Sequence, residues 1–124
     1  MPDPKRTHRQ AVEFALALPG AWEDHPWEET VAKVGTKVFV FFGSPDSPMW
    51  PAMTVKLRES HEAALAVPGA QPTGYGLGRS GWVDVPFRET GPPVGVLTDW
   101  IDESYRIVAP KKLVAELDER APRR

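Results

Sequence analysis

A sheet is first indicated by residues 31–42, Val31-Ala-Lys-Val-Gly-Thr-Lys-Val-Phe-Val-Phe-Phe42. This stretch predicts two strands, over residues 31–34 and 37–42, joined by Gly35-Thr36. A two-residue connection with glycine first is typical of a type II′ hairpin turn. The second strand is apolar on both faces, which predicts a central place in a sheet with at least one covered face.

The segments on either side of this hairpin show helix and strand patterns in turn. Upstream, Thr7 and Gln10 match a capping box and predict a helix that ends at Pro19-Gly20. Residues 22–29 fit no period and are expected to form a loop. Downstream, the predicted elements are a strand at 53–58, a short helix at 60–66, a long loop at 69–81, a strand at 82–87, a helix at 94–108 and a last helix that starts at Pro110.

This order of elements predicts an α+β fold, α-β-β-β-α-β-α-α, with a single antiparallel sheet packed against helices. The length of 124 residues fits one domain over residues 1–124. The ends, at about 1–6 and 120–124, are expected to be flexible. Pro86 places the strand at 82–87 either at an edge of the sheet or with the proline at the strand end.

The composition excludes several classes of protein. The chain has no cysteine, which removes disulfides, thiolate nucleophiles and cysteine-ligated metal sites. No apolar run approaches the ~20 residues of a membrane-spanning helix. The start of the chain is too charged for a secretory signal, so we expect a cytoplasmic protein that does not enter membranes.

The charge is distributed unevenly along the chain. The net charge of −2 argues against a dedicated nucleic-acid-binding protein. However, residues 33–88 carry a net charge of +2, whereas residues 13–32 carry −5 and residues 89–119 carry −4. The strand-rich middle of the chain is therefore mildly basic between acidic flanks.

Three blocks resemble the MmcQ/YjbR family of small bacterial domains: residues 18–27 (Leu-Pro-Gly-Ala-Trp-Glu-Asp-His-Pro-Trp), 33–39 (Lys-Val-Gly-Thr-Lys-Val-Phe) and 104–108 (Ser-Tyr-Arg-Ile-Val). Gly74-Tyr75 and Trp82 also fall where the family has a Gly-Tyr turn and a strand that begins with tryptophan. The resemblance covers about residues 9–117. It implies a CyaY-like fold with a twisted sheet, and DNA binding through a double-wing arrangement of hairpins. Two departures are Glu28, where the family usually has glycine, and the loop at 76–81, which keeps only Arg79 as a charged residue.

On this basis we expect duplex DNA to be the partner, bound weakly and with a strong dependence on salt. The expected contacts are basic side chains of the strand region, with two aromatic residues beside them. These candidates are Lys33, Lys37, Lys56, Arg58, Arg79, Tyr75 and Trp82.

Two other classes of function stay open at this stage. Trp22, Trp27 and Trp50 lie in predicted loops, where they either anchor the loops on the core or form a surface for a partner protein. His25 lies among carboxylates and is a weak candidate for a metal or small-molecule site. We find no catalytic constellation and no cofactor motif, because the Gly-x-Gly-x-x-Gly string at 76–81 opens a predicted strand rather than a helix. The chain is therefore expected to be a monomeric, non-enzymatic domain.

Overall fold

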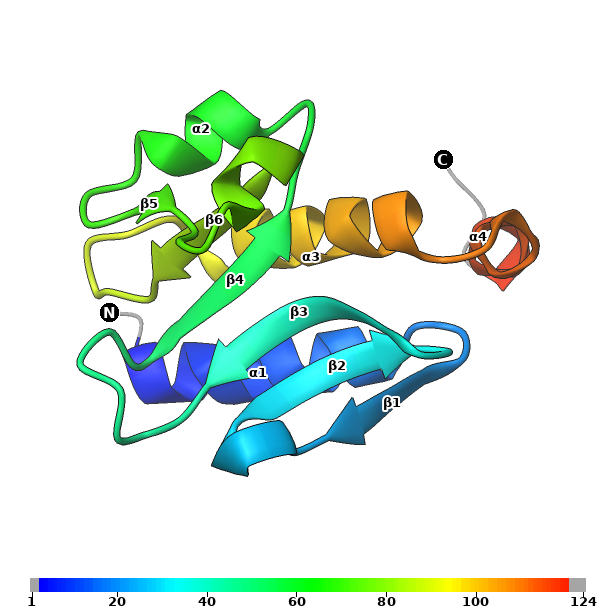
Figure 1. Cartoon of the computed structure of the whole chain (residues 1–124), viewed down its shortest axis with the longest axis horizontal. Coiled ribbons are helices and arrows are strands. Elements are labelled where there is room, and N and C mark those ends of the chain that lie inside the picture. Colours follow the sequence, from blue (N-terminus) through cyan, green and yellow to red (C-terminus); the bar gives the residue numbers. More distant parts are fainter. Residues whose placement is uncertain (1–2, 121–124) are drawn as a thin grey trace.

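The predicted hairpin lies inside the sheet of a computed structural model that describes residues 3–120. Its strands are β2 (Thr30–Val34) and β3 (Lys37–Gly43). Gly35 has a φ of 62°, as the first position of a type II′ turn requires. The other elements are α1 (Pro4–Leu16), β1 (Ala21–Asp24), η1 (Pro26–Glu28), β4 (Ala52–Lys56), α2 (His61–Leu65), β5 (Gln71–Pro72), η2 (Leu77–Ser80), β6 (Trp82–Pro86), α3 (Val94–Val108) and α4 (Lys111–Arg120) (Figure 1).

The sheet has six strands in the order β1-β2-β3-β4-β6-β5, and all neighbours are antiparallel. This confirms the α+β class and the internal position of β3. The predicted element order lacked β1, which overlaps the segment expected to be a loop at 22–29, and β5, which lies in the loop expected at 69–81. Because β5 pairs with the outer edge of β6, β6 is not an edge strand, and Pro86 is at the end of the strand instead.

The first helix starts earlier than the capping-box pattern predicted. It begins at Pro4, and the Asp3 side chain caps it by accepting a hydrogen bond from the backbone N–H of Lys5 at 3.0 Å. Thr7 is buried one turn inside the helix and does not cap it. Residues 1–6 were expected to be flexible, but residues 4–6 belong to this helix. Residues 1–2 and 121–124 lie outside the described part of the chain.

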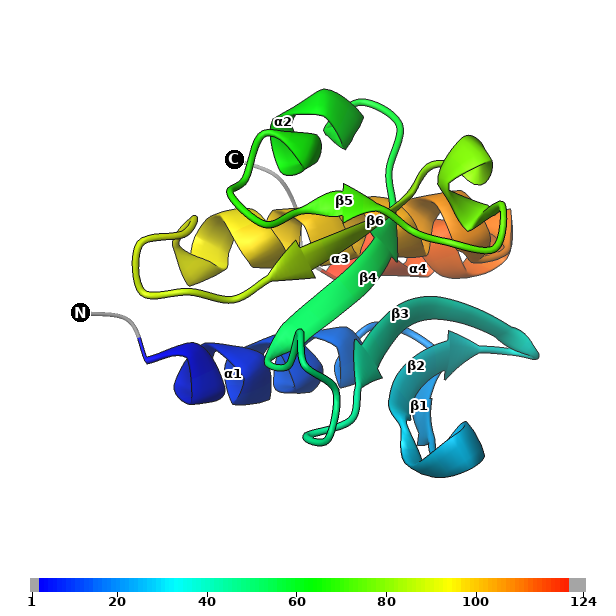
Figure 2. The ribbon, with the colours of Figure 1, turned by 60° about the vertical axis from the view of Figure 1, so that its left-hand side comes forward.

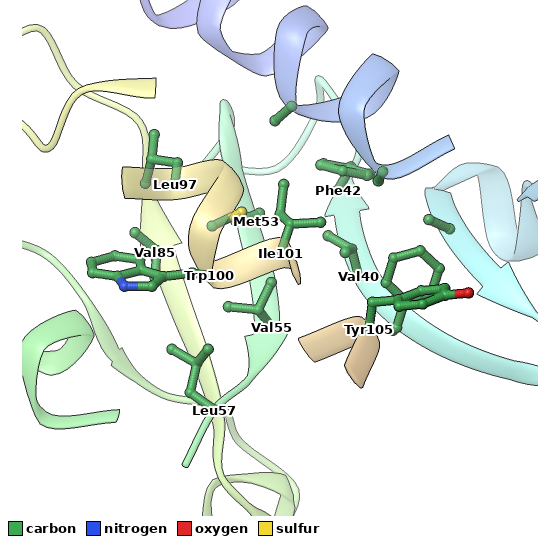
Figure 3. Packing of buried hydrophobic residues seen from close by; sticks show 14 of the residues in the cluster. Val40, Phe42, Met53, Val55, Leu57, Val85, Leu97, Trp100, Ile101 and Tyr105 are labelled. Atoms are coloured by element: carbon green, nitrogen blue, oxygen red, sulfur yellow. The ribbon is translucent and has the colours of Figure 1, made fainter. Parts of the chain in front are cut away.

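The hydrophobic core lies between the sheet and the two long helices α1 and α3, which cover one face of the sheet (Figure 1). The buried face of α3 carries the residues that its helical period predicts. Figure 3 shows four of them pointing toward apolar side chains of β3, β4 and β6: Leu97, Trp100, Ile101 and Tyr105. The opposite face of the sheet, which α1 and α3 leave free, is called the open face below.

A buried serine connects β3 and β4 where these strands separate. Only two pairs of residues join these strands, Val40 with Val55 and Phe41 with Thr54. The first half of β3, before these pairs, curves away from β4 (Figure 2). The Ser104 hydroxyl donates to the backbone carbonyl of Phe39 at 2.6 Å and accepts from the backbone N–H of Lys56 at 2.9 Å. One side chain of α3 therefore satisfies backbone groups of both strands in place of a ladder hydrogen bond.

Candidate functional site

Alternation along the strands places the polar residues of β4 and β6 on the open face. Met53 and Val55 are buried under the helices, so Thr54 and Lys56 point the other way. In the same way Asp84 lies on the open face of β6, where Thr54 donates a hydrogen bond to it at 2.8 Å. The open face is therefore a surface of mixed polar and aromatic side chains.

All five predicted basic residues lie toward one end of the sheet, but Lys33, opposite Val38 on β3, is paired with a carboxylate, and within residues 3–120 the other four are not. Lys37 begins β3, Lys56 ends β4, Arg58 follows two residues later, and Arg79 precedes β6 in η2. Because β4 is antiparallel to both β3 and β6, the starts of β3 and β6 lie at the same end as the last residue of β4. We call these four residues the basic end.

Lys37 and Lys56 line a common hollow of about 360 Å³. Its other lining residues are Val38, Phe41, Trp82, Ile107 and Val108. Among residues 3–120, neither lysine forms an ion pair with a carboxylate. Both ammonium groups therefore stay available to an anion from outside the molecule.

Lys33 is used differently from the basic end. Its ammonium group donates to the Asp24 carboxylate at 2.8 Å and lies 5.2 Å from the centre of the Trp22 ring. The hydrogen bond from Lys33, with one from the backbone N–H of His25, lowers the pKa of Asp24. Lys33 thus joins β2 to β1, and its charge is already paired.

Arg58 and Arg79 line a second hollow, of about 500 Å³, at the same end of the sheet. Glu59 and Glu62 line it as well, so the positive potential there is partly offset. The basic end thus consists of two exposed arginines beside carboxylates and two lysines beside an apolar floor.

Glu103 of α3 fixes the backbone that carries Arg58. Its carboxylate accepts hydrogen bonds from the backbone N–H groups of Arg58 at 2.8 Å and Ser60 at 3.2 Å. Burial by itself raises the pKa of Glu103, but hydrogen bonds from the Ser60 hydroxyl and from these N–H groups outweigh burial and lower it. The sequence analysis missed this role, for which a carboxylate on the polar side of a helix gives no specific signal.

Of the two aromatic candidates for nucleic-acid contact, Trp82 lies at the basic end and Tyr75 does not. Trp82 is only 8% exposed, with its ring 5.4 Å from that of Phe41, so it supports the surface and cannot stack on a base. Tyr75 is fully exposed, but it lines a different pocket, with Trp50 and Asp84. Trp82 thus supports the surface beside Lys56, and its contact with nucleic acid stays a prediction.

The three tryptophans of the alternative partner surface are not brought together by any contact within residues 3–120. Trp22 is half exposed on β1 and donates to the carbonyl of Gly35 at 3.0 Å. Trp27 is 94% exposed in η1 and has a φ of 54°, an uncommon conformation for a residue other than glycine. Trp50 is partly buried, with its ring 5.0 Å from that of His8.

His25 does not centre a metal site in the part of the chain described. It is exposed, and its Nε2 lies 3.2 Å from the carboxylate of Glu23. No group of three metal-ligating side chains occurs within residues 3–120. Of the carboxylates that surround His25 in the sequence, only Glu23 forms an ion pair with its ring within residues 3–120.

His8, by contrast, is enclosed by aromatic rings and should make folding sensitive to pH. Burial lowers the pKa of His8 below its ordinary 6.5, and a contact with the carbonyl of Phe42 raises it only in part. The unfolded chain therefore binds this proton more readily, so stability is full above about pH 6.5 and falls as the pH drops toward the lowered value.

We expect the His8→Gln variant to lose this dependence. Urea unfolding of both proteins at intervals from pH 7.5 to about 5 would measure it. This range isolates the histidine, because Asp24 and Glu103 have lowered pKa values and change stability only at lower pH. An equal slope of stability against pH in the two proteins would contradict the assignment to His8.

Comparison with known proteins identifies a family whose model matches most of the chain. A family model described as YjbR matches residues 16–107. This range begins at the last residue of α1 and includes the whole sheet and all of α3 except its last residue. No curated protein matches the chain. Within residues 3–120, no helix has the length and apolar character needed to cross a membrane.

Proposed function

The chain belongs to the YjbR family, and from this premise we propose that it is a non-enzymatic domain that binds duplex DNA through its basic end. The observation that carries the proposal is the convergence of Lys37, Lys56, Arg58 and Arg79, which come from separate segments of the chain, on one end of the sheet. Scattered cations would not present a continuous line of contacts to a phosphate backbone.

The chemistry of the four side chains fits phosphate contacts rather than recognition of bases. Lysine binds phosphate as a point charge and arginine as a planar fork of donors. The buried Trp82 provides a rigid floor beneath Lys56. Because no exposed aromatic or amide group lies at the hollow between the two lysines, we expect little dependence on sequence.

The affinity is expected to be low. Four phosphate contacts are few, and Glu59 and Glu62 reduce the potential near both arginines. Sequence-independent binding with Kd of about 10⁻⁴ M at physiological salt is consistent with this arrangement. Weak binding of this kind suits a domain that acts at high local concentration or with a second contact.

Fluorescence anisotropy of a labelled duplex of mixed sequence, titrated at about 50 and 200 mM salt, tests the proposal. With four phosphate contacts, affinity should fall about 100-fold between these two salt concentrations. The double variant Lys37→Gln/Lys56→Gln should bind more weakly and flatten the log–log slope by about 2. Absence of binding at both salt concentrations would overturn the proposal.

The matched control is Arg6→Gln/Arg9→Gln, which removes the same charge from the exposed start of α1. That start lies at the other end of the sheet, since His8 contacts the carbonyl of Phe42 near the end of β3. This control should keep the wild-type salt slope. Equal loss in both double variants would indicate attraction by net charge alone and would contradict a localised site.

A further inference from the structure

A pocket on the open face stands apart from the basic end and has a different chemistry. It has a volume of about 340 Å³, within the range of small-molecule sites. Its floor is formed by Phe41, Thr54 and Asp84, from three neighbouring strands. The β3–β4 connection contributes Trp50 to its wall, and the segment between β5 and η2 contributes Tyr75.

Asp84 is positioned at the floor of this pocket by neutral donors. The hydroxyls of Thr54 and Thr73 donate to the same carboxylate oxygen, Oδ1, at 2.8 and 2.7 Å. The other oxygen, Oδ2, receives one long hydrogen bond, from the Gln71 side chain at 3.4 Å. Within residues 3–120, no lysine, arginine or histidine forms an ion pair with this carboxylate.

The hydrogen-bonding groups at the floor are therefore acceptors. A threonine hydroxyl has one proton, and both threonines use theirs on Asp84, which leaves only lone pairs for a ligand. Glu29 adds a second carboxylate to the lining, and no basic residue lines the pocket. A ligand that fits must donate hydrogen bonds and carry positive charge, whereas a phosphate or carboxylate would be repelled.

The walls of the pocket are aromatic, which also favours a cationic ligand. Phe41, Trp50 and Tyr75 line the pocket, and aromatic rings attract ammonium groups and cover apolar bodies. Tyr75 has a φ of 59°, the left-handed conformation that a residue other than glycine adopts only when its surroundings hold it there. The strained backbone thus presents an exposed ring at the pocket.

We propose that this pocket binds a small organic cation: a primary amine on an apolar or aromatic body. The ammonium group hydrogen-bonds to Oδ2 of Asp84, and the body lies against Phe41, Trp50 and Tyr75. This site is separate from the basic end, so the proposal does not depend on DNA binding.

Three matched probes test the charge requirement on the wild-type chain: 2-phenylethylamine, 2-phenylethanol and phenylacetate. Trp50 in the wall makes tryptophan fluorescence a direct readout, and chemical shifts of the Thr73–Leu77 backbone give a second. The amine should bind in the millimolar range, with the alcohol at least about 10-fold weaker and the carboxylate undetected. No saturable binding of the amine, or equal binding of the alcohol, would overturn the proposal.

The variant Asp84→Asn tests the residue itself, because it keeps the shape and removes the charge. Its affinity for the amine should fall about 10- to 100-fold. The control Asp46→Asn makes the same charge change on the exposed β3–β4 connection, outside the pocket lining, and should bind as the wild type does. Unchanged binding by Asp84→Asn would contradict the assignment. If that variant does not fold, the three probes on the wild-type chain decide the question.

Discussion

Replacing Tyr105 with alanine is expected to lower the free energy of unfolding by about 3–5 kcal/mol. The Tyr105 side chain is fully buried, and its ring packs edge-on against Phe39 with 5.2 Å between centroids. Its hydroxyl donates to the carbonyl of Pro19 at 2.6 Å. Truncation therefore removes a large apolar contact and leaves a buried carbonyl without its donor.

The variant Tyr105→Phe separates these two contributions. It keeps the ring and removes only the hydroxyl, so we expect a loss of about 1–2 kcal/mol. Urea unfolding followed by tryptophan fluorescence would measure both variants against the wild type. A phenylalanine variant as unstable as the alanine variant would show that the hydrogen bond, and not the packing of the ring, dominates.

Tyr105 also explains why the three sequence blocks of the family resemblance occur together. Its hydroxyl reaches Pro19 of the first block, and its ring contacts Phe39 of the second. Ser104, its neighbour in the third block, donates to the carbonyl of the same Phe39. The blocks are far apart in the chain, but they form one set of contacts between α3, the hairpin and the end of α1.

Most of the fold could be predicted from the sequence because its elements follow strong local patterns. The hairpin at 31–42 and the helix at 94–108 have clear periods, and both are confirmed. β1 could not be predicted in this way, because Ala-Trp-Glu-Asp lacks an apolar alternation. Its strand depends on pairing with β2, in which Trp22 and Asp24 both contact Lys33.

The candidate sites could be predicted only in part, because they depend on how strands align. Sequence analysis identified Lys37 and Lys56, but their common hollow follows from antiparallel pairing. The register also places Lys56 opposite Trp82 and Thr54 opposite Asp84. No local pattern determines a register between strands almost 30 residues apart, so the burial of Trp82 and the pocket at Asp84 were not foreseen.

Replacing Gly81 with alanine is expected to destabilise the fold by about 2–4 kcal/mol. Gly81 has a φ of 99°, and a Cβ there would lie 2.5 Å from the backbone carbonyl oxygen of Leu57. That oxygen cannot move easily, because the N–H of Leu57 donates to the carbonyl of Gly81 at 2.9 Å and holds the end of β4 beside the start of β6. The substitution therefore combines backbone strain with a collision against another strand.

Gly76 provides the matched control for this prediction. Its φ is 79°, but no atom lies within 4 Å of the position that a Cβ would take, so Gly76→Ala should cost only about 1 kcal/mol of backbone strain. Thermal melting of the two variants would compare them directly. Equal destabilisation would mean that the close approach at Leu57 relaxes without cost. A larger loss of stability at Gly81 would show that the contact between Leu57 and Gly81 is rigid. Arg58 and Arg79 lie next to this contact, so it would hold both arginines in place at the basic end.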